Sequence, residues 1–425
     1  MKKTDSLYRL FLAILQQELI PATGCTEPIA IAYAAAMATK ELGVRPTRVK
    51  AWLSSSIIKN AKAVTIPNTN GLKGIPAAIA AGIVAGDPRK KLEVIAHIHP
   101  EQKAEIAEYA TVCPMEIQVT DSGRLFEIVL EVFAGENSAS VQIANSHTNI
   151  LAVRKNGCLI RGASEALDSQ DELLDYSHLS VRSVLDFSDS LDPADVKDLI
   201  ERQIACNTCI SRKGLEGSYG ANVGKTFLTM HPQDSLFAKV IAAAAAASDA
   251  RMGGCNLPVF ITAGSGNQGL TASLPVIEYA VLKKAPRERL CRALVLSTLI
   301  TVHQKNYIGK LSAFCGAVSA GAGSAAGIAY LDGGGYTEIS HTLVNALAIA
   351  SGMVCDGAKP SCAAKITMAV GAGLLGYEMY MHEQQFCQGE GLVAADVEKT
   401  IANIGRLGRE GMQETEREIL QMMLE

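Results

Sequence analysis

The hydrophobic pattern of the chain changes at Pro193, and this change constrains the possible fold more than any other feature. Beyond Pro193 the alternating pattern that is typical of strands disappears, and alanine-rich runs with helical periodicity replace it, which predicts an all-helical second half. Aromatic residues make up only 5% of the chain, so close packing of helix backbones is favoured over bulky cores. The helical runs lie at 193–211, 235–249, 274–284, 286–304, 311–331, 338–353, 361–383 and 393–421.

The first half predicts a mixture of helices and strands. Residues 6–42 predict two helices interrupted at Pro21–Pro28, because Thr26 can cap the second helix and Pro28 suits its first turn. Strand and helix patterns then alternate, and several β-rich runs follow. The expected strands lie at 49–53 and 93–97, the helices at 76–86 and 101–110, and the β-rich runs at 115–120, 125–134, 138–145 and 149–155.

These patterns predict an α+β fold, in which a smaller α/β-sandwich-like domain is inserted near the N-terminus of a large all-helical domain. The helical domain is expected to be the catalytic one, because the candidate metal ligands described below lie in it. We expect N-terminal helices of the catalytic domain at 1–45, the α+β domain at 46–185 and the all-helical catalytic domain at 186–425.

Charge and composition exclude several classes of function. The formal net charge is −4 and no long basic run is present, so no nucleic-acid partner is expected and the expected partner is a small molecule. The uncharged stretch Ser312–Leu331 consists mainly of Ala, Gly and Ser, which predicts a buried helix and no membrane span. Eleven irregularly spaced cysteines argue against a secreted disulfide framework and favour a reducing, cytoplasmic compartment.

Three cysteines towards the C-terminal end are the candidate metal ligands. Cys355 and Cys362 enclose a polar, turn-rich segment, and Cys315 lies upstream of them. Three thiolates without a fourth nearby favour an iron–sulfur cluster with one iron open to substrate. The alternative is three inert buried thiols, and irregular spacing alone does not decide between the two. Cys206 and Cys209 form a CxxC without a second CxxC or paired histidines, so we predict a structural role for them.

Four further segments have both a functional and a structural interpretation. The glycines of Gly264–Gly269 let backbone N–H groups converge on a carboxylate, or they form an ordinary turn between helices. Ser54–Asn60, at a strand end, could bind an anion or cap the next helix. Cys25 lies at a predicted helix N-terminus, which stabilises a thiolate, although Glu27 opposes this. His147 lies between predicted strands, where a structural histidine is more common than a catalyst.

A combined pattern is formed by Gly24–Pro28, Lys59–Asn60, His147–Asn149, Ser248–Gly254, Ser265–Gly269, Leu311–Ala313 before Cys315, and Cys355–Ala358 with Cys362. This pattern resembles the bacterial and archaeal L-cysteine desulfidase family, and the resemblance covers essentially the whole chain. The helical half is also similar to the α domain of the oxygen-sensitive iron–sulfur L-serine dehydratases, whose three cluster cysteines occur in the same order. Those dehydratases end in a cysteine that reaches the cluster, whereas this chain ends in Met422–Glu425.

The resemblance implies roles for individual residues. Cys315, Cys355 and Cys362 would hold a 4Fe-4S cluster with one iron open to substrate, without the internal cap of a terminal cysteine. Cys25 would take part in proton transfer. The implied substrate-binding residues are Lys59, Asn60, His147, Ser265, Gly266, Asn267, Gln268 and Gly269.

The implied function is that of an L-cysteine desulfidase, a carbon–sulfur lyase that converts L-cysteine to pyruvate, ammonia and hydrogen sulfide by β-elimination. We expect the enzyme to be cytoplasmic, and a homodimer is possible. The first alternative is an L-serine dehydratase that expels hydroxide with the same cluster. The second is a pyridoxal-phosphate lyase, with Lys59 as Schiff base and Ser265–Gly269 as an asparagine loop, although that group places the two much closer in sequence. The third is a non-catalytic, cluster-bearing cysteine sensor, for which no docking element is visible.

Overall fold

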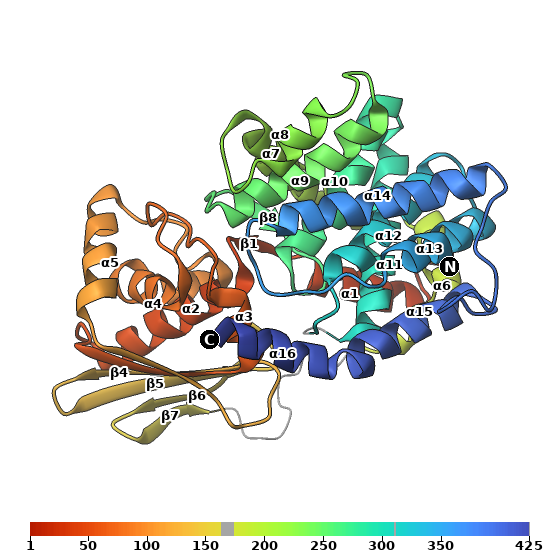
Figure 1. Ribbon diagram of the computed structural model, residues 1–425. Coiled ribbons are helices and arrows are strands. Elements are labelled where there is room, and N and C mark those ends of the chain that lie inside the picture. Colours follow the sequence, from red (N-terminus) through yellow and green to blue (C-terminus); the bar gives the residue numbers. More distant parts are fainter. Residues whose placement is uncertain (163–173, 310–311, 425) are drawn as a thin grey trace.

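The structure is a computed structural model that describes residues 1–162, 174–309 and 312–424, and its fold is α+β, as predicted. A six-stranded sheet with its covering helices forms one part of the molecule, and a larger helical part lies beside it (Figure 1). Helix α1 (Ser6–Glu18) packs in the helical part against α11 (Arg287–Ile308), after which the chain crosses to the sheet. The first helix is therefore separated from the elements that follow it.

The strand order of the sheet is β3–β2–β4–β5–β6–β7, in which β2 and β3 run parallel and the other described neighbours run antiparallel. The strands are β2 (Arg48–Leu53), β3 (Met115–Val119), β4 (Glu127–Ala134), β5 (Asn137–Ala144), β6 (Ile150–Lys155) and β7 (Cys158–Gly162). Val49, Ala51 and Leu53 alternate with less buried residues along β2, so one face of the sheet carries the core.

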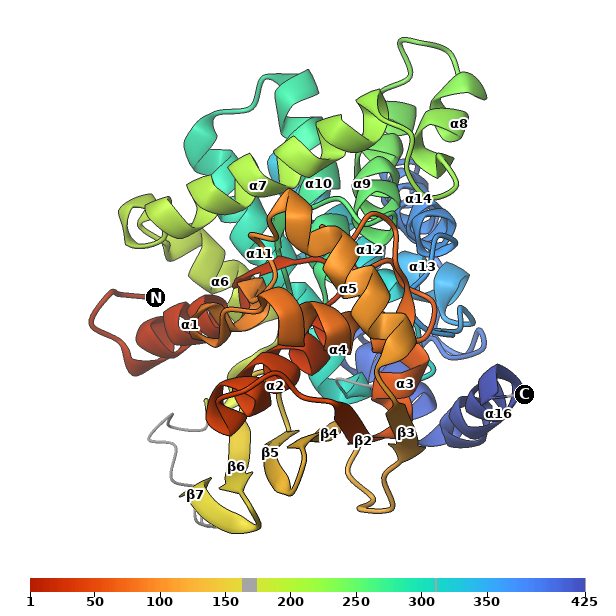
Figure 2. The same cartoon turned by 90° about the vertical axis from the view of Figure 1, so that its left-hand side faces the viewer.

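One helix covers this face of the sheet, and two more pack behind it. Helix α2 (Thr26–Leu42) lies against β4 and β5, α4 (Gly74–Ala85) packs on α2, and α5 (Pro100–Val112) packs on α4 (Figure 2). Most residues of α2 are buried, because sheet and helix enclose it from two sides. The sequence assigned residues 1–45 to the helical domain; in the structure α1 and the short strand at Pro21–Thr23 pack there, whereas α2 packs on the sheet.

The helical part is arranged around α12 (Gly316–Leu331), which contacts α10, α11, α13 and α14. Every residue of α12 after Gly316 is buried, and a Cβ added at Gly321 would lie 2.5 Å from the carbonyl oxygen of Ala369. The predicted buried small-residue helix is thus present, and no described helix is long and apolar enough to cross a membrane. The other helices that follow the sheet in the sequence are α6 (Val181–Ser190), α7 (Lys197–Glu216), α8 (Val223–Thr229), α9 (Leu236–Met252), α10 (Gly266–Lys283), α13 (Tyr336–Ala350), α14 (Cys362–Met381), α15 (Val397–Arg406) and α16 (Gln413–Leu424).

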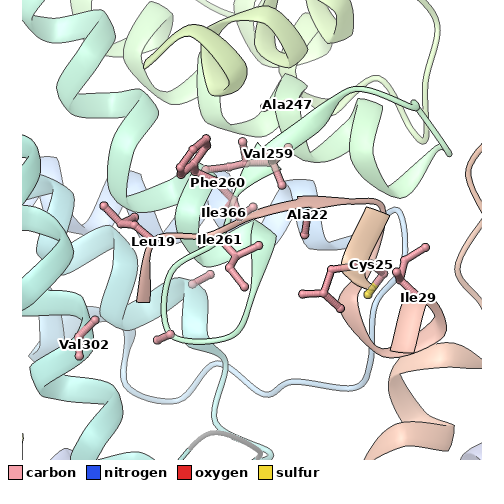
Figure 3. Packing of buried hydrophobic residues seen from close by; sticks show 14 of the residues in the cluster. Leu19, Ala22, Cys25, Ile29, Ala247, Val259, Phe260, Ile261, Val302 and Ile366 are labelled. Atoms are coloured by element: carbon pink, nitrogen blue, oxygen red, sulfur yellow. The ribbon is translucent and has the colours of Figure 1, made fainter. Parts of the chain in front are cut away.

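A short pair of strands links the two parts of the molecule. β1 (Pro21–Thr23) pairs antiparallel with β8 (Pro258–Phe260), with Ala22 opposite Val259. Figure 3 shows the apolar side chains around this pair, with Phe260 at one end and Cys25 at the other, where α2 begins. The pairing therefore brings the N-terminus of α2 close to the turn that precedes α10.

Several predicted elements differ from the structure. The expected strand at 93–97 is wrong: a 3₁₀ helix occupies Pro88–Glu93, and Val94 and Ile95 are buried without a strand partner, so burial alone explains the apolar run. The expected helix at 393–421 is interrupted by a π-helical turn at Leu407–Gly411 between α15 and α16. Helix α10 begins at Gly266, earlier than expected, so the glycine-rich turn is the first turn of a helix. Strands β7 and β8 and helix α8 were not predicted.

Candidate active site

A cavity of about 170 Å³ lies where the sheet part meets the helical part, and most of the predicted site residues line it. Those residues are Cys25, Lys59, Asn60, His147, Ser265, Asn267, Gln268, Cys315, Cys355 and Cys362. Gly266 and Gly269 do not line it, and each instead permits a close approach. A Cβ at Gly266 would lie 2.4 Å from the Arg251 guanidinium, and one at Gly269 would lie 2.0 Å from the carbonyl oxygen of Phe260.

Four helix N-termini converge on the cavity. Cys25, Ser265 and Cys315 are the N-cap residues of α2, α10 and α12, and Cys362 is the first residue of α14. Unpaired backbone N–H groups and the positive end of the helix dipole favour anions at such termini. The cavity therefore suits both thiolate ligands and a substrate carboxylate.

The backbone holds the three candidate ligands around one side of the cavity. A short antiparallel bridge joins Phe314 to Val354, and the Cys315 N–H donates to the carbonyl of Met353 at 3.0 Å, so Cys315 and Cys355 lie on neighbouring strands of chain. The loop to Cys362 turns at Gly357, whose φ is +92°. A Cβ at Gly357 would lie 2.3 Å from the Lys59 carbonyl oxygen, so this loop packs directly on α3 (Ser55–Ala61).

The thiols fit an iron–sulfur cluster. Burial raises the pKa of the Cys315 thiol to about 12, and burial also raises the pKa of Cys362, so both are neutral thiols until a metal displaces their protons. Within the described residues no three Cys, His, Asp or Glu side chains converge on a single metal-ion position. Each cysteine of a cluster binds a different iron, and three thiols around one cavity are a donor set of that kind.

Two lysines beside the cysteines were not predicted. Lys305 of α11 is buried in the cavity wall, and this burial lowers its pKa to about 8. Lys365 of α14 pairs with Asp356 and donates to the carbonyl of Val354 at 2.8 Å. Both amines bring positive charge towards the three thiols. Lys305 lies in a helical run whose sequence has no feature that distinguishes it from the rest of α11.

Cys25 has a different environment from the one that its helix position predicted. It is the N-cap of α2, but its thiol donates to Glu27 Oε2 at 3.3 Å. Burial, followed by the Glu27 carboxylate, raises the pKa of Cys25 well above its ordinary range. The expected stabilisation of a thiolate by the helix dipole is therefore outweighed, and the resting group is a thiol.

Lys59 also has an unexpected partner. Its buried ammonium donates to both carboxylate oxygens of Glu416, at 2.5 and 2.7 Å, and Glu416 lies on the C-terminal helix α16. Figure 1 shows α16 extending from the helical part towards α3. The ion pair therefore holds helix α16 against α3 in the sheet part of the molecule.

Glu416→Gln should destabilise the protein, because it leaves the buried Lys59 ammonium without a charged partner. We expect the free energy of unfolding to fall by about 1.5–3 kcal/mol, the usual contribution of a hydrogen bond between charged groups, because the glutamine oxygen and the Cys355 carbonyl at 3.4 Å remain as neutral acceptors only. The matched control is Glu414→Gln, since Glu414 lies on the same helix in an exposed pair with Arg417 and should change stability by under about 0.5 kcal/mol. Urea unfolding of both variants measures the difference, and equal losses would contradict the assigned role of Glu416.

Arg251 links two of the converging helices. Its Nε donates to the carbonyl of Gly24 at 3.1 Å, and its Nη1 donates to Asn267 Oδ1 at 3.0 Å. Ser248 also donates to that oxygen at 3.3 Å. The amide of Asn267 is thereby oriented with its oxygen held by the protein. Arg251 belongs to Ser248–Gly254 in the combined sequence pattern, which predicted no individual role for it.

Arg251→Lys should lower stability, because an ammonium cannot reproduce two fixed donors in the guanidinium plane. Hydrogen bonds from charged donors contribute about 1.5–3 kcal/mol each, so we expect a loss of about 2–3 kcal/mol in the free energy of unfolding. Arg406→Lys is the control, because Arg406 is largely exposed in its pair with Glu410. An Arg251→Lys protein as stable as the control would show that these contacts contribute little.

The remaining predicted residues are also placed. His147 follows β5 and lines the cavity, with its ring edge-to-face with Phe126 at 4.8 Å between centroids. Asn60 donates to Glu27 Oε1 at 3.1 Å, so it holds a protein carboxylate in this structure. Cys206 and Cys209 lie on α7 and are not among the cavity residues. Their predicted structural role remains a prediction.

Comparison with known proteins places the chain in a family. The model of the serine dehydratase alpha chain family matches residues 89–421, which include the three candidate ligands but not Cys25 or Lys59. A UPF0597 protein of Desulfitobacterium hafniense (strain Y51) is 53% identical over 424 residues, covering all of this chain and 98% of its own length. UPF0597 proteins of Lachnoclostridium phytofermentans and Finegoldia magna are 45% and 44% identical, each over 98% of this chain and over 100% and 99% of their own lengths. With most of its length matched, the chain belongs to the serine dehydratase alpha chain family, whose chemistry is that of iron–sulfur lyases.

Proposed function

We propose that the protein is an L-cysteine desulfidase that eliminates hydrogen sulfide from L-cysteine with the help of a 4Fe-4S cluster, leaving pyruvate and ammonia. The observation that carries this proposal is the meeting of Cys315, Cys355 and Cys362 with the Cys25 thiol around one cavity, in a chain of an iron–sulfur lyase family. The elimination needs an acceptor for the α-proton and stabilisation of the departing sulfur. Cys25 lies where the α-proton can be received, and the three ligand cysteines would hold the cluster that stabilises the departing sulfur.

The protein's own residues bind and orient the substrate. The N-terminus of α10, with Ser265 and the amide of Asn267, presents donors suited to the substrate carboxylate. Arg251 fixes that amide, and the Cys25–Glu27 pair lies across the same cavity to receive a proton. When bound, the cluster supplies a Lewis acid for the leaving sulfur. The aminoacrylate that results tautomerises and hydrolyses to pyruvate and ammonia without further catalysis.

The second candidate is an L-serine dehydratase, and the name of the matching family favours it. The two reactions share the α-proton transfer and differ in the group that leaves the β-carbon. The affinity of iron for soft sulfur ligands supports the desulfidase, as does the whole-chain resemblance to that family. Side-by-side assays of sulfide and pyruvate from L-cysteine and L-serine decide the question. Faster turnover of L-serine at equal substrate concentration would overturn the proposed substrate.

The proposed cluster has a spectroscopic and an analytical test. Anaerobically purified protein should contain iron and inorganic sulfide and should absorb broadly near ~400 nm, with bleaching by dithionite. A Schiff base with pyridoxal phosphate would instead respond to borohydride. Iron-free protein that binds pyridoxal phosphate would replace the cluster mechanism with the rival one. The proposed cytoplasmic location and the possible homodimer are tested separately, by fractionation and by light scattering.

Activity should be lost in air and should return after anaerobic treatment with iron, sulfide and thiol. An iron without a protein ligand is the one that oxidants remove first, and three cysteines leave one iron in this position. Iron content and pyruvate formation, measured together before and after exposure to air, show whether activity is lost together with iron. Full turnover by aerobically prepared, iron-free protein would contradict the cluster mechanism.

A further inference from the structure

Glu27 is the one carboxylate among the described residues that line the cavity. It lies in the first turn of α2, two residues after Cys25, and its side chain is buried. A carboxylate at a helix N-terminus is favoured by the helix dipole, which agrees with the burial of Glu27 at this position. The other titratable side chains of the wall are those of Cys25, Lys59, His147, Arg251, Lys305, Cys315, Cys355, Cys362 and Lys365.

Three neighbours orient the Glu27 carboxylate, and each presents a donor. The Cys25 thiol and the Thr26 hydroxyl lie 3.3 and 3.0 Å from Oε2, and the Asn60 amide lies 3.1 Å from Oε1. These three donors fix both oxygens, so the carboxylate has little freedom to turn away from Cys25. An acceptor in fixed contact with a thiol that itself faces the cavity is the arrangement that proton transfer requires.

Cys25 alone is poorly suited to remove a proton. Its pKa lies well above the ordinary range because of burial and the Glu27 charge, so at neutral pH the group is a thiol, whose sulfur is too weak a base to take the α-proton. A thiol becomes a base only if a neighbour first accepts its proton. Glu27 is the acceptor in contact with it.

We propose that Glu27 is the proton acceptor of the elimination: Cys25 gives its own proton to Glu27 and takes up the α-proton of the substrate in its place. This inference rests on the proposed function. From the sequence, the negative charge of Glu27 was expected only to disfavour a Cys25 thiolate. Because Glu27 acts through Cys25, its role is to accept and position a proton rather than to touch the substrate.

The proton and electron balance of the step closes without an oxidant or reductant. The Cys25 S–H bond breaks, its proton moves to Glu27, and the electron pair stays on sulfur. The thiolate forms a new S–H bond with the α-proton, while the C–H electron pair becomes the second bond between Cα and Cβ. The Cβ–S bond breaks and its electron pair leaves with hydrosulfide. The Cys25 thiol then gives its proton to hydrosulfide and takes a proton back from Glu27, which restores the Cys25 thiol and the Glu27 carboxylate.

The test uses the anaerobic, cluster-loaded protein with Glu27→Gln, Glu27→Asp and the control Glu41→Gln. Glutamine keeps the shape of the side chain and removes the acceptor, aspartate keeps the acceptor on a shorter side chain, and Glu41 lies at the far end of the same helix. We expect turnover of L-cysteine and exchange of its α-proton with deuterated solvent to fall about 10²–10⁴-fold in Glu27→Gln. Glu27→Asp should recover part of this loss, and Glu41→Gln should match the wild type. Iron content should remain unchanged in all three.

A second measurement does not depend on turnover. Alkylation of Cys25 by iodoacetamide, followed by peptide mass analysis, reports the thiolate fraction of that one residue. Without the Glu27 charge the thiol pKa should fall, and each unit of change raises the thiolate fraction about tenfold. We therefore expect several-fold faster alkylation in Glu27→Gln than in wild type. A fold that is merely loosened by the substitution would also expose Cys255, which therefore serves as the internal reference.

The outcomes separate this inference from the proposed function. If the wild type is active and Glu27→Gln exchanges the α-proton at a rate within threefold of the wild-type rate, Glu27 is not the acceptor. The proposed desulfidase function would then still stand. Unchanged Cys25 alkylation in Glu27→Gln would overturn the Cys25–Glu27 contact on which the role depends. A cluster-loaded wild type that eliminates from neither L-cysteine nor L-serine would overturn the proposed function and this inference with it.

Discussion

Replacing Cys315, Cys355 or Cys362 by alanine should remove the cluster and reduce turnover to background. Each substitution takes one of three proposed protein ligands, and no other cysteine except Cys25 lines the cavity among the described residues. Iron and sulfide counts on anaerobically purified variants, together with the absorption near ~400 nm, measure the loss. The effect should be all-or-none, because the one other thiol in the described part of the cavity wall, that of Cys25, is held by Glu27.

The two cysteines on α7 provide the control for this experiment. Cys206→Ala and Cys209→Ala should keep iron, spectrum and activity, since both thiols lie outside the cavity wall. Near-normal melting temperatures would show that the ligand variants are folded. Iron that persists in the three ligand variants but falls in the Cys206 or Cys209 variant would show that the ligand assignment is wrong.

The fold could be predicted from the sequence where periodicity and burial act together. Strand and helix patterns identified β2, α5 and the β4–β5 hairpin, because alternation or a helical stripe there matches the face that is buried. The strand predicted at 93–97 is wrong because Val94 and Ile95 are buried without a strand partner. Periodicity reports which residues are buried, but it does not report whether a neighbouring strand is available.

The candidate site was predictable where its residues form local motifs and not where its contacts are distant in sequence. Cysteine spacing and glycine-rich turns identified Cys315, Cys355, Cys362 and the N-terminus of α10. The partner of Lys59 is Glu416, from the opposite end of the chain, and no local pattern predicts such a pair. The role of Arg251 likewise depends on Gly24, which β1–β8 pairing brings beside it. Such contacts follow from tertiary structure alone.

Cys25→Ser should keep the cluster and lose most of the turnover. A serine hydroxyl has a far higher pKa than a thiol, so the Glu27 carboxylate cannot deprotonate it, and the α-proton then has no acceptor in contact with it. The loss should fall in the range of about 10²–10⁴ that a general base contributes, and not near twofold. Exchange of the substrate α-proton with deuterated solvent, measured with iron content, reports the step directly.

The competing explanation of such a loss is that Cys25 is a buried structural thiol. Cys291→Ser is the matched control, because Cys291 is also buried, lies on α11 and does not line the cavity. If both variants lose only stability and the surviving protein keeps a normal kcat, Cys25 has no part in proton transfer. A folded, cluster-loaded Cys25→Ser protein that still exchanges the α-proton at the wild-type rate would point instead to Lys305, whose pKa of about 8 leaves part of its amine neutral and able to accept a proton.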